Sequence, residues 1–138
     1  MSTQLATFTL DGHTLAIAVE QVQEVLRSQT RTRVPLAPPR VAGLVNLRGQ
    51  VLTAVDLRVP LGLPPRTEGE PMVVVVRVGG EPVSLLVDTI GDVVEVDERD
   101  FEPAPDTLTG AARELILGAY KLPDRLVLAL DADRAVGL

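Results

Sequence analysis

The sequence has no cysteine and only one histidine, His13. Without cysteine there can be no disulfide scaffold, thiol nucleophile, iron–sulfur cluster or cysteine-ligated zinc site. A single histidine excludes a multi-histidine metal centre, and its place in an Asp-Gly-His turn suits it poorly to a buried Ser-His-Asp triad. We therefore expect no catalytic residues, no metal and no cofactor, and we do not expect an enzyme.

Aromatic residues and long apolar runs are also scarce. Two Phe, one Tyr and no Trp cannot form a stacking platform for single-stranded nucleic acid. The longest apolar runs have five residues, at 15–19, 72–76 and 126–130, whereas a bilayer span needs about 20. The N-terminus has no basic residues before an apolar stretch. We expect a cytoplasmic protein without a signal peptide and without direct membrane insertion.

Charge is divided unequally along the chain. The formal net charge is −6, and residues 1–66 hold seven Arg against four acids, whereas residues 67–138 hold six basic residues against fifteen acids. Phosphate binding favours a basic surface, so we expect no nucleic-acid partner. The split between the two halves indicates two different binding surfaces.

Valine and leucine, with 21 residues each, dominate what is present. They form short segments bounded by Gly, Pro and Asp, which predicts strands. Four pairs of such segments are separated by two turn residues and predict β-hairpins, with turns at 11–12, 48–49, 79–80 and 123–124. Short helices are predicted at 20–27, from apolar residues at 22, 25 and 26, and at 108–115.

The hairpins recur with a fixed spacing, which indicates a tandem duplication. An offset of 68 residues places 10–26 on 78–94, and an offset of 75 places 43–56 on 118–131. The approximate halves, 5–66 and 71–138, are each too small to supply a core alone. We expect a single domain over 1–138 whose halves pack through an apolar seam, with an exchange of strands between them left open.

The segment 43–58, Gly-Leu-Val-Asn-Leu-Arg-Gly-Gln-Val-Leu-Thr-Ala-Val-Asp-Leu-Arg, resembles the signature of CheW-like chemotaxis coupling proteins. In that family a glycine and two apolar residues precede Asn-Leu-Arg-Gly, and an apolar strand ends in Asp-Leu-Arg. Further blocks in the same order resemble the family, so that the resemblance spans about 5–136; they lie at 22–26, 34–38, 61–63, 87–93 and 118–131. Thr53 departs from the pattern, because the family usually has proline there.

The resemblance implies a mainly β fold of two small SH3-like five-stranded β-barrel subdomains packed together, with one or two short helices. It also implies a non-catalytic adaptor in chemotaxis or a related chemosensory pathway. Such a protein couples the cytoplasmic signalling tip of a chemoreceptor to the regulatory domain of a CheA-type histidine kinase. The protein would be recruited from the cytoplasm to membrane-associated receptor arrays.

Matching the family position by position implies a set of receptor-binding residues: Val22, Gly43, Asn46 and Arg48. Gly49, Asp56 and Gly118 are assigned to turns and structural positions. From the residues alone, other interpretations stay open. Arg48 also suits a solvated turn and Val22 suits core packing. Gly43 suits either a β-bulge or the close approach of another backbone.

A second functional hypothesis is a small β-barrel that binds a ligand or acts as an enzyme on an unknown substrate. It requires a deep pocket with convergent polar groups, for which the Val/Leu alternation offers few candidates.

Overall fold

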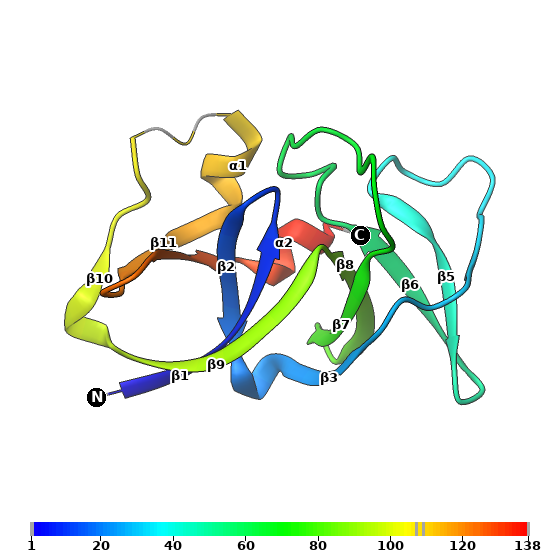
Figure 1. Cartoon of the computed structure of the whole chain (residues 1–138). Coiled ribbons are helices and arrows are strands. Elements are labelled where there is room, and N and C mark those ends of the chain that lie inside the picture. Colours follow the sequence, from blue (N-terminus) through cyan, green and yellow to red (C-terminus); the bar gives the residue numbers. More distant parts are fainter. Residues whose placement is uncertain (1, 107, 109, 138) are drawn as a thin grey trace.

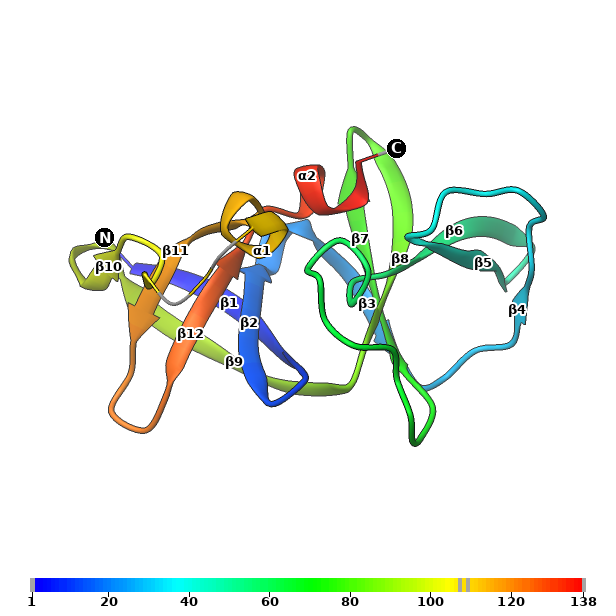
Figure 2. The same ribbon diagram turned by 90° about the horizontal axis from the view of Figure 1, so that it is seen from above.

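The computed structural model describes residues 2–106, 108 and 110–137, and these form two curved β-sheets packed side by side (Figures 1 and 2). The expected mainly β fold is confirmed. The first sheet, sheet A, contains β1 Ser2–Leu10, β2 His13–Ala18, β9 Thr89–Asp97, β10 Phe101–Glu102, β11 Ile116–Lys121 and β12 Leu126–Leu130. The second, sheet B, contains β3 Val22–Leu26, β4 Arg31–Thr32, β5 Val41–Leu47, β6 Gln50–Asp56, β7 Met72–Val78 and β8 Glu81–Val87.

Each sheet combines strands from both halves of the sequence. The strand order is β10-β11-β12-β2-β1-β9 in sheet A and β3-β7-β8-β6-β5-β4 in sheet B. The chain crosses from sheet A to sheet B between β2 and β3, and returns between β8 and β9. Each sheet has six strands rather than the five expected, because a two-residue strand, β4 or β10, is added at one edge.

The two sheets correspond position by position under the offsets seen in the sequence. An offset of 68 places β1, β2 and β3 on β7, β8 and β9, and an offset of 75 places β5 and β6 on β11 and β12. Even the parallel pairings agree: Ala54 pairs with Ser84 in sheet B, and Ala129 pairs with Ala16 in sheet A. The molecule therefore has an internal pseudo-twofold relation.

The four predicted hairpins are confirmed as β1–β2, β5–β6, β7–β8 and β11–β12. In the first two, both turn residues have positive φ: 50° and 82° at Asp11 and Gly12, and 52° and 84° at Arg48 and Gly49. Such turns match the right-handed twist of the strands they join.

The helix predicted at 20–27 is wrong. Residues Val19–Gln21 form a single 3₁₀ turn, η1, and β3 follows directly as an edge strand beside β7. The error has a physical cause: β3 has a bulge between Val22 and Glu24, so Val22 and Val25 can share one face although they are three residues apart. The same spacing is typical of a helix face.

Three short helical elements complete the fold: η2 Glu98–Asp100, α1 Gly110–Leu115 and α2 Ala132–Val136. α1 lies within the helix predicted at 108–115, of which residue 109 is outside the described residues. Asp131 accepts a hydrogen bond from the Arg134 N–H and so caps α2. No helix in the described part of the chain is long and apolar enough to cross a bilayer.

The largest hydrophobic cluster lies between the sheets. It joins Phe8, Leu15 and Ile17 of sheet A to Val55 and Leu85 of sheet B, all nearly inaccessible to solvent. Each sheet also has one smaller cluster of its own. In sheet B it lies around Val45 and Val75, and in sheet A around Leu5 and Val127. Because the main core is shared, separating the two sheets would expose apolar surface to water.

Candidate functional site

An apolar groove opens between the two sheets, with a volume of about 200 Å³. We call it the inter-sheet groove. Its lining comes from five strands and the start of η1: Ala6, Thr7, Phe8, Ile17, Val19, Val22, Val25, Val74, Ile90, Gly91 and Val93. Thr7 alone among these carries a polar side chain, and its hydroxyl donates to the Asp92 carbonyl over 2.6 Å.

The two walls of the groove are equivalent under the internal repeat. Val22 and Val25 on β3 correspond, at an offset of 68, to Ile90 and Val93 on β9. Both strands carry a one-residue bulge between the two wall residues, which turns both side chains toward the groove. Val25 is 47 % exposed and Val93 57 % exposed, so each wall presents apolar surface to solvent.

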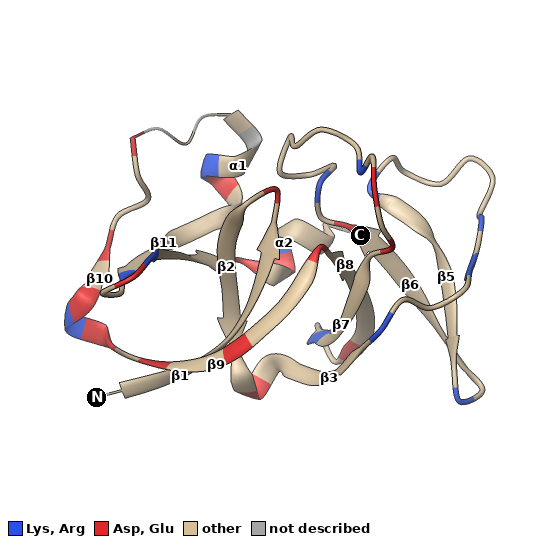
Figure 3. Ribbon diagram, viewed as in Figure 1, with Lys and Arg blue, Asp and Glu red and all other residues tan. Residues whose placement is uncertain are grey.

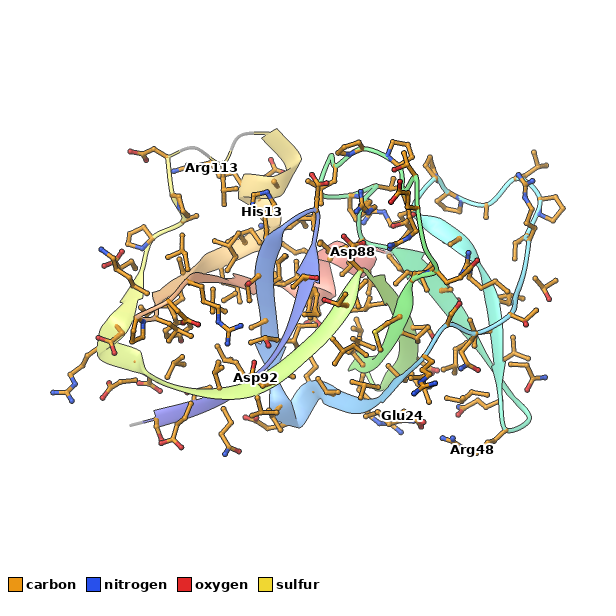
Figure 4. The ribbon with its side chains drawn as sticks, in the orientation of Figure 1. His13, Glu24, Arg48, Asp88, Asp92 and Arg113 are labelled. Carbon is orange, nitrogen blue, oxygen red and sulfur yellow. The ribbon has the colours of Figure 1, made fainter. Side chains whose placement is uncertain are left out.

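Arg48 lies at the tip of the β5–β6 hairpin and forms an ion pair with Glu24 on β3 (Figure 4). The hydrogen bond to Glu24, together with the carboxylate charge, raises the pKa of Arg48 above its ordinary value. The guanidinium is therefore charged at any physiological pH. The hairpin tip is held against the strand that carries Val22 and Val25.

Asn46 and Gly49 shape this tip. The Asn46 side-chain oxygen accepts the Gly49 N–H over 3.0 Å and so stabilises the turn that presents Arg48. Both residues are exposed. Asn46 is thus committed to the turn through its oxygen, and neither residue lines the inter-sheet groove.

Gly43 lies in β5, outside the groove lining, where a bulge between Val41 and Gly43 meets the backbone of β4. Its φ is 141°, and a Cβ there would lie 2.5 Å from the Thr32 carbonyl oxygen. Both interpretations from the sequence, a bulge and a close backbone approach, therefore apply at once. Gly118 occupies the equivalent place in β11, where a Cβ would lie 2.6 Å from the Glu102 carbonyl oxygen.

Asp56 is the last residue of β6, at the opposite end of the strand from the Arg48 turn. Its carboxylate accepts the Arg58 N–H over 3.0 Å, which stabilises the turn that follows the strand. Under the offset of 75 it corresponds to Asp131, the cap of α2. Asp56 is therefore a structural residue of the strand end.

A partly buried ionic cluster holds the crossing from β8 to β9. Asp88 accepts hydrogen bonds from Arg58 over 2.7 Å and from the Asp11 N–H over 2.7 Å, and pairs with Arg66 over 2.8 Å. Burial opposes the ionisation of Asp88, but these donors outweigh it and hold the pKa of the carboxyl below its ordinary value. We call these four residues the Asp88 cluster; it ties the β1–β2 turn of sheet A to sheet B.

Of the residues that line the groove, only Val22 was predicted as a site residue from the sequence; the second wall, with Ile90 and Val93, and the Asp92–Arg125 pair beside it were not. Ile90 and Val93 form the second wall, and Asp92 pairs with Arg125 over 3.2 Å beside it. The hydrogen bond from Arg125 is the main cause that lowers the pKa of Asp92. The signal was present, because the offset of 68 already places Val22, Glu24 and Val25 on Ile90, Asp92 and Val93.

The chemistry of the groove favours an apolar protein surface over a small polar ligand. Its single polar side chain, Thr7, already donates to a backbone oxygen. A ligand-binding or catalytic pocket needs several convergent polar groups. The fold and the site together define a small two-sheet β protein with an apolar groove between its sheets.

Comparison with known proteins agrees with this class. A family model described as a CheW-like domain matches residues 4–137. The Chemotaxis protein CheW of Rhizobium meliloti (strain 1021) is 30 % identical over 134 residues, covering 94 % of this chain and 84 % of that protein. The Chemotaxis protein CheW of Bacillus subtilis (strain 168) is 32 % identical over 131 residues, with the same coverage.

The fold has a solved counterpart. The crystal structure of scaffolding protein TtCheW from Thermoanaerobacter tengcongensis matches with a TM-score of 0.84 at 25 % identity, covering 94 % of this chain and 89 % of that one. The chain belongs to the CheW-like family, the family of a chemotaxis scaffold.

Proposed function

We propose that this chain is a non-catalytic adaptor that couples chemoreceptors to a CheA-type histidine kinase. The observation that carries the proposal is the apolar inter-sheet groove beside the hairpin of the Asn-Leu-Arg-Gly motif. The receptor's cytoplasmic signalling tip would occupy this groove, and the regulatory domain of the kinase would bind elsewhere on the same molecule. The proposed location is the cytoplasm, at receptor arrays.

Among the residues matched from the family, we assign direct contact with the receptor to some and a structural role to others. Val22 contributes apolar surface in the groove, and Arg48 contributes a fixed positive charge beside it. Asn46 and Gly43 act indirectly, by shaping the turn that carries Arg48 and the strand that leads to it. We add Val25, Ile90 and Val93 to the receptor-binding set, because they line the same groove.

The contact area offered by the groove is modest and contains little aromatic surface. Interfaces of this kind depend on a few well-packed central side chains. We infer that each receptor contact is weak by itself and gains strength when many copies are held together in an array.

The test is a binding measurement with a receptor signalling-tip helical hairpin encoded in the same genome. Val25→Glu and Val93→Glu each place a charge in the apolar groove, and we expect each to weaken binding at least tenfold, since burying an unpaired carboxylate is costly. The matched control is Val59→Glu, because Val59 is 43 % exposed but lies outside the groove lining.

Folding of each variant is checked by circular dichroism before binding is measured. Equal binding by Val25→Glu, Val93→Glu and the unaltered chain would place the receptor elsewhere. A folded chain that bound neither the receptor tip nor the kinase regulatory domain would refute the adaptor function itself.

A further inference from the structure

A second pocket opens at one end of sheet A, where β1 and β11 begin and β2 and β12 end. It has a volume of about 510 Å³, and its lining also includes residues of η1, η2 and β10. It shares only Ile17 with the inter-sheet groove. We call it the sheet A pocket. Its volume is typical of a small-molecule site, and the mouths of β-barrels are common places for such sites.

The pocket exists because sheet A carries a small side chain where sheet B carries a large one. At the offset of 68, Ala18 of sheet A corresponds to Leu86 of sheet B. Leu86 is only 3 % exposed and belongs with Val45 and Val73 to the smaller cluster of sheet B. Ala18 instead lines the sheet A pocket. The alanine therefore leaves free the room that the larger leucine side chain occupies in sheet B.

The lining combines aromatic rings with a carboxylate. Its polar side chains are those of Thr3, Gln21, Glu98 and Tyr120. Phe101 and Tyr120 are two of the three aromatic residues of the chain, and their ring centroids lie 5.1 Å apart. Burial and the charge of Glu98 raise the pKa of Tyr120, in agreement with a carboxylate near the phenol. Aromatic rings and a carboxylate are the groups that attract an organic cation.

The charge around this part of the pocket is negative. Glu98, Asp100 and Glu102 are all exposed. The basic residue among them, Arg99, is paired with Asp97 over 3.0 Å. Figure 3 shows acidic residues gathered where β9 runs into β10. A cation is therefore attracted to the pocket and an anion is repelled from it.

The remainder of the lining is apolar. Ala16 and Ala129 are paired on the neighbouring strands β2 and β12, and both line the pocket. Leu117 and Phe101 line it as well, although they are 60 % and 42 % exposed. An apolar group bound in the pocket would remove part of this surface from water, which favours binding.

We propose that the sheet A pocket binds a small organic ammonium ion, with its cationic head beside Glu98 and Tyr120 and its apolar body over Ala18. The inference goes beyond the adaptor function and does not depend on it, because the ligand is neither receptor nor kinase. An ion pair with an exposed carboxylate contributes up to about fivefold in affinity, and an ammonium group over an aromatic ring about two- to fivefold. Together they favour an ammonium ion over a neutral molecule of the same shape by roughly tenfold.

Three probes that share one aromatic ring and differ in charge test the proposal: 2-phenylethylammonium, 2-phenylethanol and phenylacetate. Each is titrated into the isotope-labelled full chain, and the amide chemical shifts report both the Kd and the place of binding. We expect 2-phenylethylammonium to shift residues of the sheet A pocket and to bind roughly tenfold more tightly than 2-phenylethanol. Phenylacetate should bind more weakly than the alcohol, because the acidic surroundings repel it.

Two variants separate the charge from the shape of the pocket. Glu98→Gln should lower the affinity for 2-phenylethylammonium about fivefold and leave that for 2-phenylethanol unchanged, because only a charge is removed. Its matched control is Glu95→Gln, since Glu95 is also an exposed acid but lies outside the pocket lining. Ala18→Leu reproduces the leucine of sheet B and should weaken both probes at least about tenfold by filling the pocket.

Circular dichroism checks that each variant is folded, and the exposed Glu98→Gln change decides the question even if Ala18→Leu does not fold. The inference is wrong if none of the probes binds with a Kd below about 10 mM, or if the shifted residues lie outside the sheet A pocket. It is also wrong if the ammonium ion and the alcohol bind equally, or if Glu98→Gln and Glu95→Gln have the same effect.

Discussion

At the scale of the residue, the backbone conformation at Gly43 and the neighbouring strand β4 together exclude a side chain at this position. Its φ of 141° disfavours any side chain, and the Thr32 carbonyl occupies the place of a Cβ. A larger residue at 43 would therefore disturb the β4–β5 pairing before it could affect a partner. Gly43→Asp, which the motif alone would suggest as a binding variant, cannot separate a lost contact from a lost fold.

We expect Gly43→Ala to lower the free energy of unfolding by about 3 kcal/mol or more, because strain and a backbone clash add. Urea denaturation measures this. Gly49→Ala is the control: Gly49 has φ 84° but open space around its Cβ position, so the cost should be only about 1–2 kcal/mol. Equal costs at the two positions would mean that β4 moves aside freely.

Ser84 is a second residue whose surroundings predict how a substitution changes stability. Its side chain is fully buried in β8, and its hydroxyl has no hydrogen-bond partner among the described residues. The equivalent position in sheet A is Ala16, also buried. A buried hydroxyl without a partner costs about 1–3 kcal/mol.

Ser84→Ala should accordingly raise the free energy of unfolding by about 1 kcal/mol, measured by thermal or urea denaturation. The reverse change in the other sheet, Ala16→Ser, is the matched control and should be destabilising by a similar amount or more. A loss of stability in Ser84→Ala would show that the hydroxyl is used.

At the scale of the element, the two crossings between the sheets are held differently. The crossing from β8 to β9 contains the Asp88 cluster, whereas at the equivalent crossing from β2 to β3 Gln21 donates to the Arg77 carbonyl over 3.2 Å and to the Asp133 carboxylate over 3.3 Å. Groove residues Val22 and Ile90 follow these crossings directly. The ionic crossing should therefore be the more sensitive to charge and pH.

We expect Asp88→Asn to lower the free energy of unfolding by about 2 kcal/mol at pH 7, because the buried Arg58 and the half-buried Arg66 lose their counter-charge. The pKa of Asp88 is lower in the folded chain than the unfolded value of about 3.9. Its stabilisation is therefore complete above roughly pH 5 and is lost as the pH falls through the folded pKa.

Urea denaturation of the unaltered chain and of Asp88→Asn between pH 3 and pH 7 checks this. The difference between their free energies of unfolding should narrow below about pH 4. Asp124→Asn serves as the control, because Asp124 is exposed, lies 3.9 Å from the neighbouring Arg125 guanidinium on the surface and should change stability little. A gap that stayed constant down to pH 3 would rule out ionisation as its source.

At the scale of the whole molecule, we expect the shared core and the exchanged strands to make the two sheets unfold as one cooperative unit. Sheet A needs β1 and β2 from the first half, and sheet B needs β7 and β8 from the second. The largest hydrophobic cluster takes residues from both. Neither half of the chain can complete a sheet by itself.

Unfolding should therefore be a single two-state transition. The only tyrosine, Tyr120, lies in sheet A and there is no tryptophan, so tyrosine fluorescence follows sheet A while circular dichroism follows both sheets. We expect the two urea curves to coincide. Separate fragments 1–70 and 71–138 should each lack a cooperative transition and regain one when mixed; non-coincident curves would mean that the sheets unfold independently.

Local features were predictable from the sequence because they depend on near neighbours. The four hairpins follow from turn chemistry between alternating apolar segments, and the Asn46–Arg48 tip follows from one motif. The bulged strand β3 was mistaken for a helix because an i, i+3 apolar spacing suits both. Only pairing with β7, a neighbour distant in sequence, selects the strand.

The sequence by itself determined the β class, the internal repeat, the absence of thiol chemistry and the charge of each half. Only the tertiary structure decided that each sheet is assembled from both halves, that Val22 and Ile90 line one groove, and that Arg48 and Asp92 are the more exposed members of their ion pairs. The reason is physical. Strand order and side-chain exposure depend on contacts between residues some 70 positions apart, whereas spacing patterns report only on a residue's neighbours along the chain.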